Sequence, residues 1–172
     1  MARICSVFAS VAALSLGVVT SGCGNGDPKT PKVVPGDMPS GESWTGVYYH
    51  PVFGYLHLVE EGTNVVGRWK TTDQSRWGEL SGTKSGNVLH YAWKEHKIGM
   101  VGAAAESTGH GYFQYKPGTD NPTIAELDGQ FGLGAAETGS DWHNIKQQGR
   151  TADLKSVTAD VPGQTGGNPG WQ

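Results

Sequence analysis

Apolar and polar residues alternate along the middle of the chain, from residue 44 to residue 149. Within 87–95, for example, Leu89, Tyr91 and Trp93 fall on one side and polar or small residues on the other. A period of two is that of a β-strand, whose successive side chains point to opposite faces. The alternation recurs between turn residues and predicts strands at 44–50, 53–60, 64–72, 76–83, 87–95, 109–116, 123–132 and 140–148.

Nearly all of these predicted strands are joined by short links, which favours antiparallel pairing of sequence neighbours. A sheet of such hairpins can close on itself and so leave no unpaired edge. Glycine also recurs beside large apolar residues, as in VVGRW at 65–69 and AELDGQFG at 125–132. Glycine inside a strand marks a bend or a close approach of backbones, and small barrels need bends to close. We therefore predict an all-β fold, a single antiparallel up-and-down β-barrel of about eight strands.

The segments that flank the barrel region, residues 44–149, have a different composition. Residues 23–43 are rich in proline and glycine, and residues 150–172 end in a Gly/Pro-rich stretch. Such sequences bury too little apolar surface to fold by themselves. We predict a disordered, flexible N-terminal tether at 23–43 and a flexible C-terminal tail at 150–172, with a short amphipathic piece at 154–157.

The first 22 residues have the layout of a secretory signal. Arg3 is the only charged residue, and a run of uncharged, mostly apolar and small residues follows it. The run is marginal in length for a membrane span. One interpretation is an ordinary signal peptide that is cleaved near Ser21 or Gly22 and leaves Cys23 as a free thiol.

The other interpretation rests on the residues 20–23, Thr-Ser-Gly-Cys, which resemble the lipobox of bacterial lipoproteins. The resemblance implies a lipoprotein signal peptide at 1–22 and a diacylglycerol attached to the sulfur of Cys23. It implies a chain held to a membrane by N-terminal acyl chains and located in the cell envelope. Because Gly24 and not aspartate follows the cysteine, the sorting rule of enteric bacteria points to the outer membrane. Cys5 would be removed with the signal peptide, so the mature chain could form no disulfide.

Two stretches of the barrel region carry a second resemblance. W-x-G-x-Y at 44–48 and L-x-G-x-F-G at 127–132 are similar to the pattern of the lipocalin and streptavidin superfamily. The resemblance implies a small β-barrel whose interior holds one small ligand or is filled by side chains. It covers about a hundred residues and assigns no ligand-binding position.

Aromatic residues provide the candidate binding positions. The alternation directs several of them to the inner face, namely Trp44, Trp69, Tyr91, Trp93 and Phe113. They would either form the core of the barrel or line a pocket for a small apolar ligand. Trp77 and Trp142 fall near predicted strand ends, where exposed aromatic side chains are typical of a partner-binding surface. The nearly uncharged loop at 98–108 is a candidate ligand-facing element.

Other classes of function find no support in the sequence. The net charge of −3 over 172 residues is unlike the basic footprint of nucleic-acid-binding proteins. The chain has no nucleophile elbow, P-loop or dinucleotide motif. Its six histidines include no pair at the i, i+2 spacing that places two ligands on one face of a strand, so no metal and no cofactor are predicted.

The sequence therefore predicts an envelope lipoprotein that acts as a non-catalytic binding or scaffolding module, with an envelope protein as partner. A lipocalin-like carrier of a small apolar ligand is the alternative, and an enzyme that uses a barrel pocket ranks last. The two leading alternatives differ in one physical property, because a carrier needs an open interior and a scaffold does not.

Overall fold

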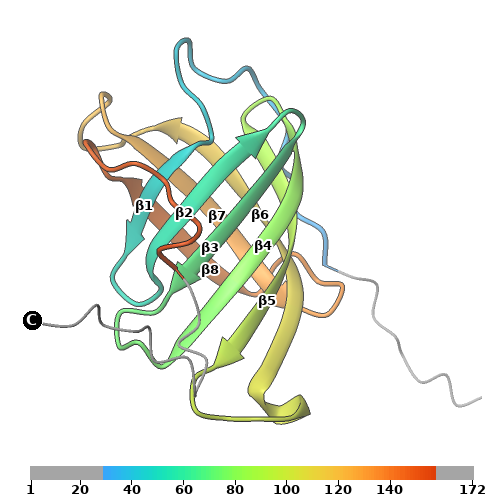
Figure 1. Ribbon diagram of the computed structural model, residues 1–172. Coiled ribbons are helices and arrows are strands. Elements are labelled where there is room, and N and C mark those ends of the chain that lie inside the picture. The colour runs from blue at the N-terminus through green and yellow to red at the C-terminus, as the bar shows by residue number, and fades with distance from the viewer. Residues whose placement is uncertain (1–28, 158–172) are drawn as a thin grey trace, which may run out of the picture.

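The computed structural model describes residues 29–157 of the chain, which form one closed antiparallel β-barrel (Figure 1). Each strand pairs with its neighbours in sequence, and β1 pairs with β8 to close the barrel. The elements are β1 (Gly46–His50), β2 (Gly54–Glu61), β3 (Asn64–Lys70), β4 (Arg76–Ser85), β5 (Val88–Lys97), the 3-10 helix η1 (Ala103–Ala105), β6 (Glu106–Pro117), β7 (Ala125–Leu133) and β8 (Ser140–Lys146). The predicted up-and-down barrel of eight strands is confirmed, and it is consistent with a lipocalin-like barrel. Within residues 29–157, no helix is long and apolar enough to cross a membrane.

The two ends of the barrel differ. We call the end that carries the β1–β2, β3–β4, β5–β6 and β7–β8 connections the open end, and the opposite end the closed end. In Figure 1 the open end is at the bottom and the closed end at the top. At the closed end the β2–β3 and β4–β5 connections are two-residue turns and the β6–β7 connection spans 118–124, whereas the β5–β6 connection at the open end, residues 98–105, contains η1.

Inside the barrel, large side chains lie over glycines of the neighbouring strand. Trp69 is directly opposite Gly78, and Trp93 is directly opposite Gly109. A Cβ atom added at Gly78 would overlap the six-membered ring of Trp69, and one at Gly109 would lie 2.7 Å from Cζ2 of Trp93. The glycines noted in the sequence are therefore places of close approach, where an indole ring lies flat across the adjacent backbone.

The N-terminal segment 29–43 lies along the barrel and does not hang free. The backbone carbonyl of Lys29 accepts a hydrogen bond from the N–H of Glu137, at 3.0 Å. Gly36 and Asn87 exchange two hydrogen bonds, at 2.7 and 3.0 Å, and Met38 packs against the core. The prediction of a free tether is corrected for these residues, because backbone pairing compensates for the few apolar side chains. The remainder of the predicted tether, 23–28, lies outside the described residues.

A network of charged and hydroxyl groups joins this segment to the closed end. Glu42 accepts hydrogen bonds from the Tyr115 hydroxyl and from Nζ of Lys146, the latter at 2.7 Å. Glu60 pairs with Lys84 and accepts a hydrogen bond from the backbone N–H of Trp44, at 3.1 Å. The segment therefore caps this end of the barrel before the chain enters β1.

The C-terminal segment 150–157 also contacts the barrel. The guanidinium of Arg150 lies 4.4 Å from the ring centroid of Tyr55, and the N–H of Asp153 donates to Nδ1 of His57, at 3.0 Å. Val157, in the piece predicted to be amphipathic, is buried. These residues cross the outer face of β2 (Figure 1), so the prediction of a flexible tail is corrected for 150–157. Residues 158–172 lie outside the described part.

Candidate ligand-binding site

A cavity of about 280 Å³ opens into the barrel interior at the open end. Its walls come from β3 to β8 and from the β1–β2 connection. The residues that line it are Phe53, Trp69, Arg76, Trp93, Glu95, Ser107, Phe131, Leu133, Ser140 and Trp142. Five of these ten residues are aromatic, and the polar side chains are those of Arg76, Glu95 and two serines.

Trp142 separates the cavity from a packed core. Its ring centroid lies 5.1 to 5.6 Å from those of Phe53, Trp69, Phe113 and Phe131. Toward the closed end the interior is filled by fully buried side chains, the largest of which are Trp44, Tyr48, Tyr91, Tyr115 and Phe113. The barrel is thus filled at its closed end and hollow at its open end.

The aromatic rings that line the cavity support one another by edge-to-face contacts. Phe53 and Phe131 lie 5.4 Å apart at 81°, and Trp93 and Phe131 lie 5.8 Å apart at 90°. The indole N–H of Trp93 donates to the carbonyl of His110, at 3.2 Å, which fixes its ring against the wall. Rings held in this way present a preformed apolar surface, because edge-to-face pairs are favourable in themselves.

An ion pair lies among the aromatic rings. Nη1 of Arg76 is 3.2 Å from Oε1 of Glu95, whose neighbour in the strand register is Ser107. Glu95 is the more buried partner, with 13% of its side chain exposed against 38% for Arg76. A guanidinium carries five N–H donors, so Arg76 can hold Glu95 and also donate to an acceptor within the cavity.

Several polar atoms in and below the cavity floor are buried without a hydrogen-bond partner among the residues that the structure describes. They are Nε1 of Trp69, Nε1 of Trp142, the hydroxyl of Tyr91 and the side-chain amide of Asn144. Burial raises the pKa of the Tyr91 hydroxyl, which therefore remains a hydrogen-bond donor. Unpaired buried groups are uncommon in folded proteins and cost stability. Hydrogen-bonding capacity is thus concentrated around Trp142.

The five aromatic residues predicted to face inward are all buried in the barrel. Trp69 and Trp93 line the cavity, whereas Trp44, Tyr91 and Phe113 belong to the packed core. Phe53, Phe131, Trp142 and the Arg76–Glu95 pair were not predicted to line it. The alternation of 123–132 could have identified Phe131, because Leu127 and Phe131 have the same parity.

The predicted partner-binding surface at Trp77 and Trp142 does not exist as a single patch. Trp142 is only 3% exposed and lies inside the barrel, so its assignment to a surface was wrong. Trp77 lies on the outer face of β4, where its ring stacks on His96 with centroids 4.3 Å apart. The error has a simple cause, since Trp142 shares its parity with Asn144 and Lys146, and polar residues at both positions hid the inward face.

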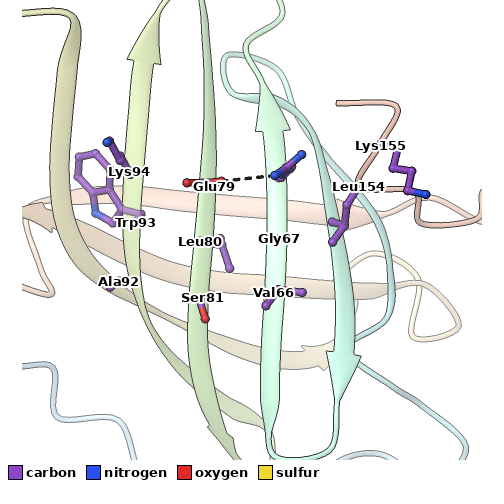
Figure 2. Close-up of a pocket in the computed structure, with 11 residues that line it drawn as sticks. Val66, Gly67, Glu79, Leu80, Ser81, Ala92, Trp93, Lys94, Leu154 and Lys155 are labelled. Carbon is purple, nitrogen blue, oxygen red and sulfur yellow. Dashed lines mark ion pairs between the residues drawn. The ribbon is translucent and has the colours of Figure 1, made fainter. Parts of the chain in front are cut away.

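A broad groove on the outer wall is the second hollow of interest. It has a volume of about 660 Å³ and lies over β3, β4 and β5, next to Leu154 and Lys155 (Figure 2). Arg68 and Glu79 pair across it at 3.6 Å, and the side chains of Ser81 and Ala92 between the strands are small. The groove is less enclosed than the cavity and Trp93 is the one aromatic residue among those that line it, so the cavity is the stronger candidate site.

Histidine and carboxylate side chains in the described residues form pairs on the outer wall. His90 lies 3.1 Å from Glu137, and His143 lies 3.0 Å from Asp128. Across 29–157 there is no group of three or more histidine, cysteine, aspartate or glutamate residues that could hold a metal ion.

Comparison with known proteins identifies no relative of this chain. The chain matches no family model, no curated protein and no solved structure. The candidate site is therefore defined by its own geometry, an aromatic cavity with one ion pair at the open end of the barrel.

Proposed function

We propose that this protein is a membrane-anchored envelope lipoprotein whose barrel binds one small, largely apolar ligand in the open-end cavity. A cavity of about 150 Å³ is enough to bind benzene, so one of about 280 Å³ that is open at one side has room for a molecule of up to three rings. Natural ligand sites are likewise mostly apolar, with a few polar groups that fix orientation. Binding is the whole of the proposed activity, and catalysis is not part of it.

The observation that carries this proposal is the contrast between the two halves of the barrel. A scaffold that used only its outer surface would gain stability from a completely filled interior, because cavities destabilise folded proteins. The closed half is filled in this way, by Trp44, Tyr48 and Tyr115 among others. The open half keeps its aromatic side chains around a hollow. This difference favours the carrier over the scaffolding alternative.

The ion pair suggests the polar character of the ligand. Arg76 is the more exposed partner and has donors beyond the one that contacts Glu95. A carboxylate, sulfonate or carbonyl oxygen on the ligand could therefore accept from Arg76 while the rings hold the apolar part. The proposed ligand class is a small aromatic or alicyclic molecule with one acceptor or anionic group.

The anchor completes the proposal. The lipobox-like residues 20–23 support acylation of Cys23, and acyl chains would hold the protein at a membrane surface, most simply the outer membrane. These residues lie outside the described part of the chain. The anchor can be tested by mass spectrometry of the N-terminal peptide, after the protein is purified from membranes. The proposal requires a diacylglyceryl group on Cys23.

Titration of the full chain with the neutral fluorophore N-phenyl-1-naphthylamine tests the cavity. We expect saturable binding with energy transfer from tryptophan, because Trp69, Trp93 and Trp142 line the site. Ser107→Phe fills the cavity and should weaken binding at least tenfold. Ser81→Phe, which adds the same group on the outer wall, should leave binding unchanged. Equal affinity in both variants would contradict the proposed site.

A further inference from the structure

The open end of the barrel carries several exposed apolar side chains. We call Val52, Met100, Val101 and Leu133 the apolar rim; they come from the β1–β2 and β5–β6 connections and from the end of β7. Val101 is 93% exposed and Leu133 is 72% exposed. Large apolar side chains at this exposure on three segments of the same end form a candidate contact surface.

The connections that bear the rim are almost free of charge. Residues 51–53, 98–105 and 133–136 contain no charged side chain. The nearest charges are Asp73 and Arg76 around the β3–β4 turn, Lys97 and Glu106 at the two ends of the β5–β6 connection, and Glu137 within the β7–β8 connection. Both ends of the barrel carry ion pairs, such as Arg76–Glu95 at the open end and Glu60–Lys84 at the closed end. The sequence around the four rim residues is therefore uncharged, and charged side chains flank it.

The path of the N-terminal segment brings the proposed anchor to the same side. The carbonyl of Lys29 accepts hydrogen bonds from Glu137, at 3.0 Å, and from the Thr138 hydroxyl, at 3.4 Å. Both residues belong to the β7–β8 connection, which begins after Leu133. Figure 1 shows the segment starting beside this connection and running up to the closed end. The chain thus enters the described structure near the open end.

The short stretch of chain between Cys23 and Lys29 limits how far the anchor can lie from the barrel. Only six residue steps separate Cys23 from Lys29, and a fully extended chain of that length spans about 20 Å. Because 29–43 is fixed to the barrel by its hydrogen bonds, it adds no slack. An acyl group on Cys23 would therefore hold the β7–β8 connection, and the rim next to it, close to the lipid.

We propose that the apolar rim lies against the lipid bilayer, so that the mouth of the cavity opens toward the membrane. The inference rests on the proposed acylation of Cys23, and it adds an orientation and a source of ligand. The two acyl chains of a diacylglyceryl group are enough for stable anchoring, and apolar side chains next to the anchor would add a fixed orientation. The ligand would then be a molecule that partitions into the bilayer and reaches the cavity without crossing water.

Lipid-borne quenching tests this orientation in the acylated full chain. The chain is reconstituted into vesicles of phosphatidylethanolamine and phosphatidylglycerol, with or without nitroxide-labelled lipid. An environment-sensitive dye is placed by Val101→Cys on the rim, or by Glu61→Cys at the closed end as the matched control. Both positions are exposed. We expect a blue shift and at least twofold quenching of the Val101→Cys label, with the Glu61→Cys label unchanged.

A second pair of variants separates the rim from the anchor. Leu133→Asp should remove at least half of the quenching of the rim label while the chain still floats with vesicles. Ile145→Asp, at an exposed apolar residue of β8 outside the rim, should have no effect. A chain that floats while both labels stay unquenched overturns the rim contact alone. A blue-shifted but unquenched rim label overturns it in favour of a protein occupant. A chain that fails to float overturns the rim contact and the anchor together.

Discussion

The indole of Trp142 stands edge-on to the indole of Trp69, with centroids 5.2 Å apart and planes at 70°. Trp142 comes from β8 and Trp69 from β3, so the contact crosses the interior of the barrel. It lies where the packed core ends and the cavity begins. Stability and binding therefore depend on the same pair of side chains.

Removal of Trp142 should destabilise the barrel. Trp142→Ala would open a void against Trp69, Phe113 and Phe131, and we expect the free energy of unfolding to fall by about 3–5 kcal/mol. Urea denaturation followed by far-UV circular dichroism measures the change. Trp77→Ala, on the outer wall, should cost no more than about 1 kcal/mol. Equal losses of unfolding free energy in the two variants would show that Trp142 stabilises the fold no more than a tryptophan on the outer wall.

The glycine beneath Trp69 provides a test of ring placement. Gly78→Ala puts a methyl group where the Trp69 ring lies, so the ring must move into the cavity or the strands must separate. We expect a loss of about 1–3 kcal/mol in unfolding free energy and a weaker affinity for N-phenyl-1-naphthylamine. Gly36→Ala is the matched control, because its new methyl would make an ordinary contact, 3.5 Å from Asn87. Unchanged probe affinity in Gly78→Ala would show that Trp69 does not shape the cavity.

The ion pair in the cavity should set the charge preference of the ligand. Glu95→Gln removes the negative partner of Arg76 and should strengthen binding of 1-anilinonaphthalene-8-sulfonate about tenfold, a typical effect of a charge-assisted hydrogen bond. Arg76→Gln should weaken binding of the same anionic probe by a similar factor.

Neutral N-phenyl-1-naphthylamine shares the aromatic framework of the anionic probe without the sulfonate. Its affinity should change less than threefold in either variant. Parallel shifts for both probes would indicate a change in cavity shape and would contradict a specific role for the charge of Arg76.

The cap at the closed end should weaken in acid. Hydrogen bonds from Lys146 and from Tyr115 hold the pKa of Glu42 below its ordinary value of 4.5. The unfolded chain therefore takes up this proton first, and the stabilisation is present above about pH 4.5 and lost as the pH falls through the lowered pKa.

Glu42→Gln measures that contribution. In urea denaturation at pH 7 the wild-type protein should have a higher free energy of unfolding than the Glu42→Gln variant. This difference in free energy should shrink as the pH falls below 4. The protection factor of the Asn87 amide, whose N–H donates to Gly36 in the segment 29–43, should fall over the same pH range in wild type. A stability difference that stays constant with pH would show that the Glu42 carboxylate is not its source.

The alternation of the sequence was sufficient to predict the barrel and the direction of most side chains. Leu89, Tyr91 and Trp93 lie inside, and the glycines lie under rings of the neighbouring strand, because a pleated strand sends alternate residues to opposite faces whatever their partners. Short links likewise fixed the antiparallel order, since a tight turn joins only adjacent strands.

The tertiary structure alone decided which end of the barrel is hollow and which residues surround it. A period of two places Trp69 and Tyr91 on the same face but carries no information about depth, so one lines the cavity and the other fills the core. Trp142 was misplaced because its inward neighbour Asn144 is polar. The segment 29–43 was predicted to be a free tether because its composition offers little apolar surface to bury. It is instead held by hydrogen bonds to residues distant in sequence, such as Asn87 and Glu137. Such contacts exist only once the barrel has closed.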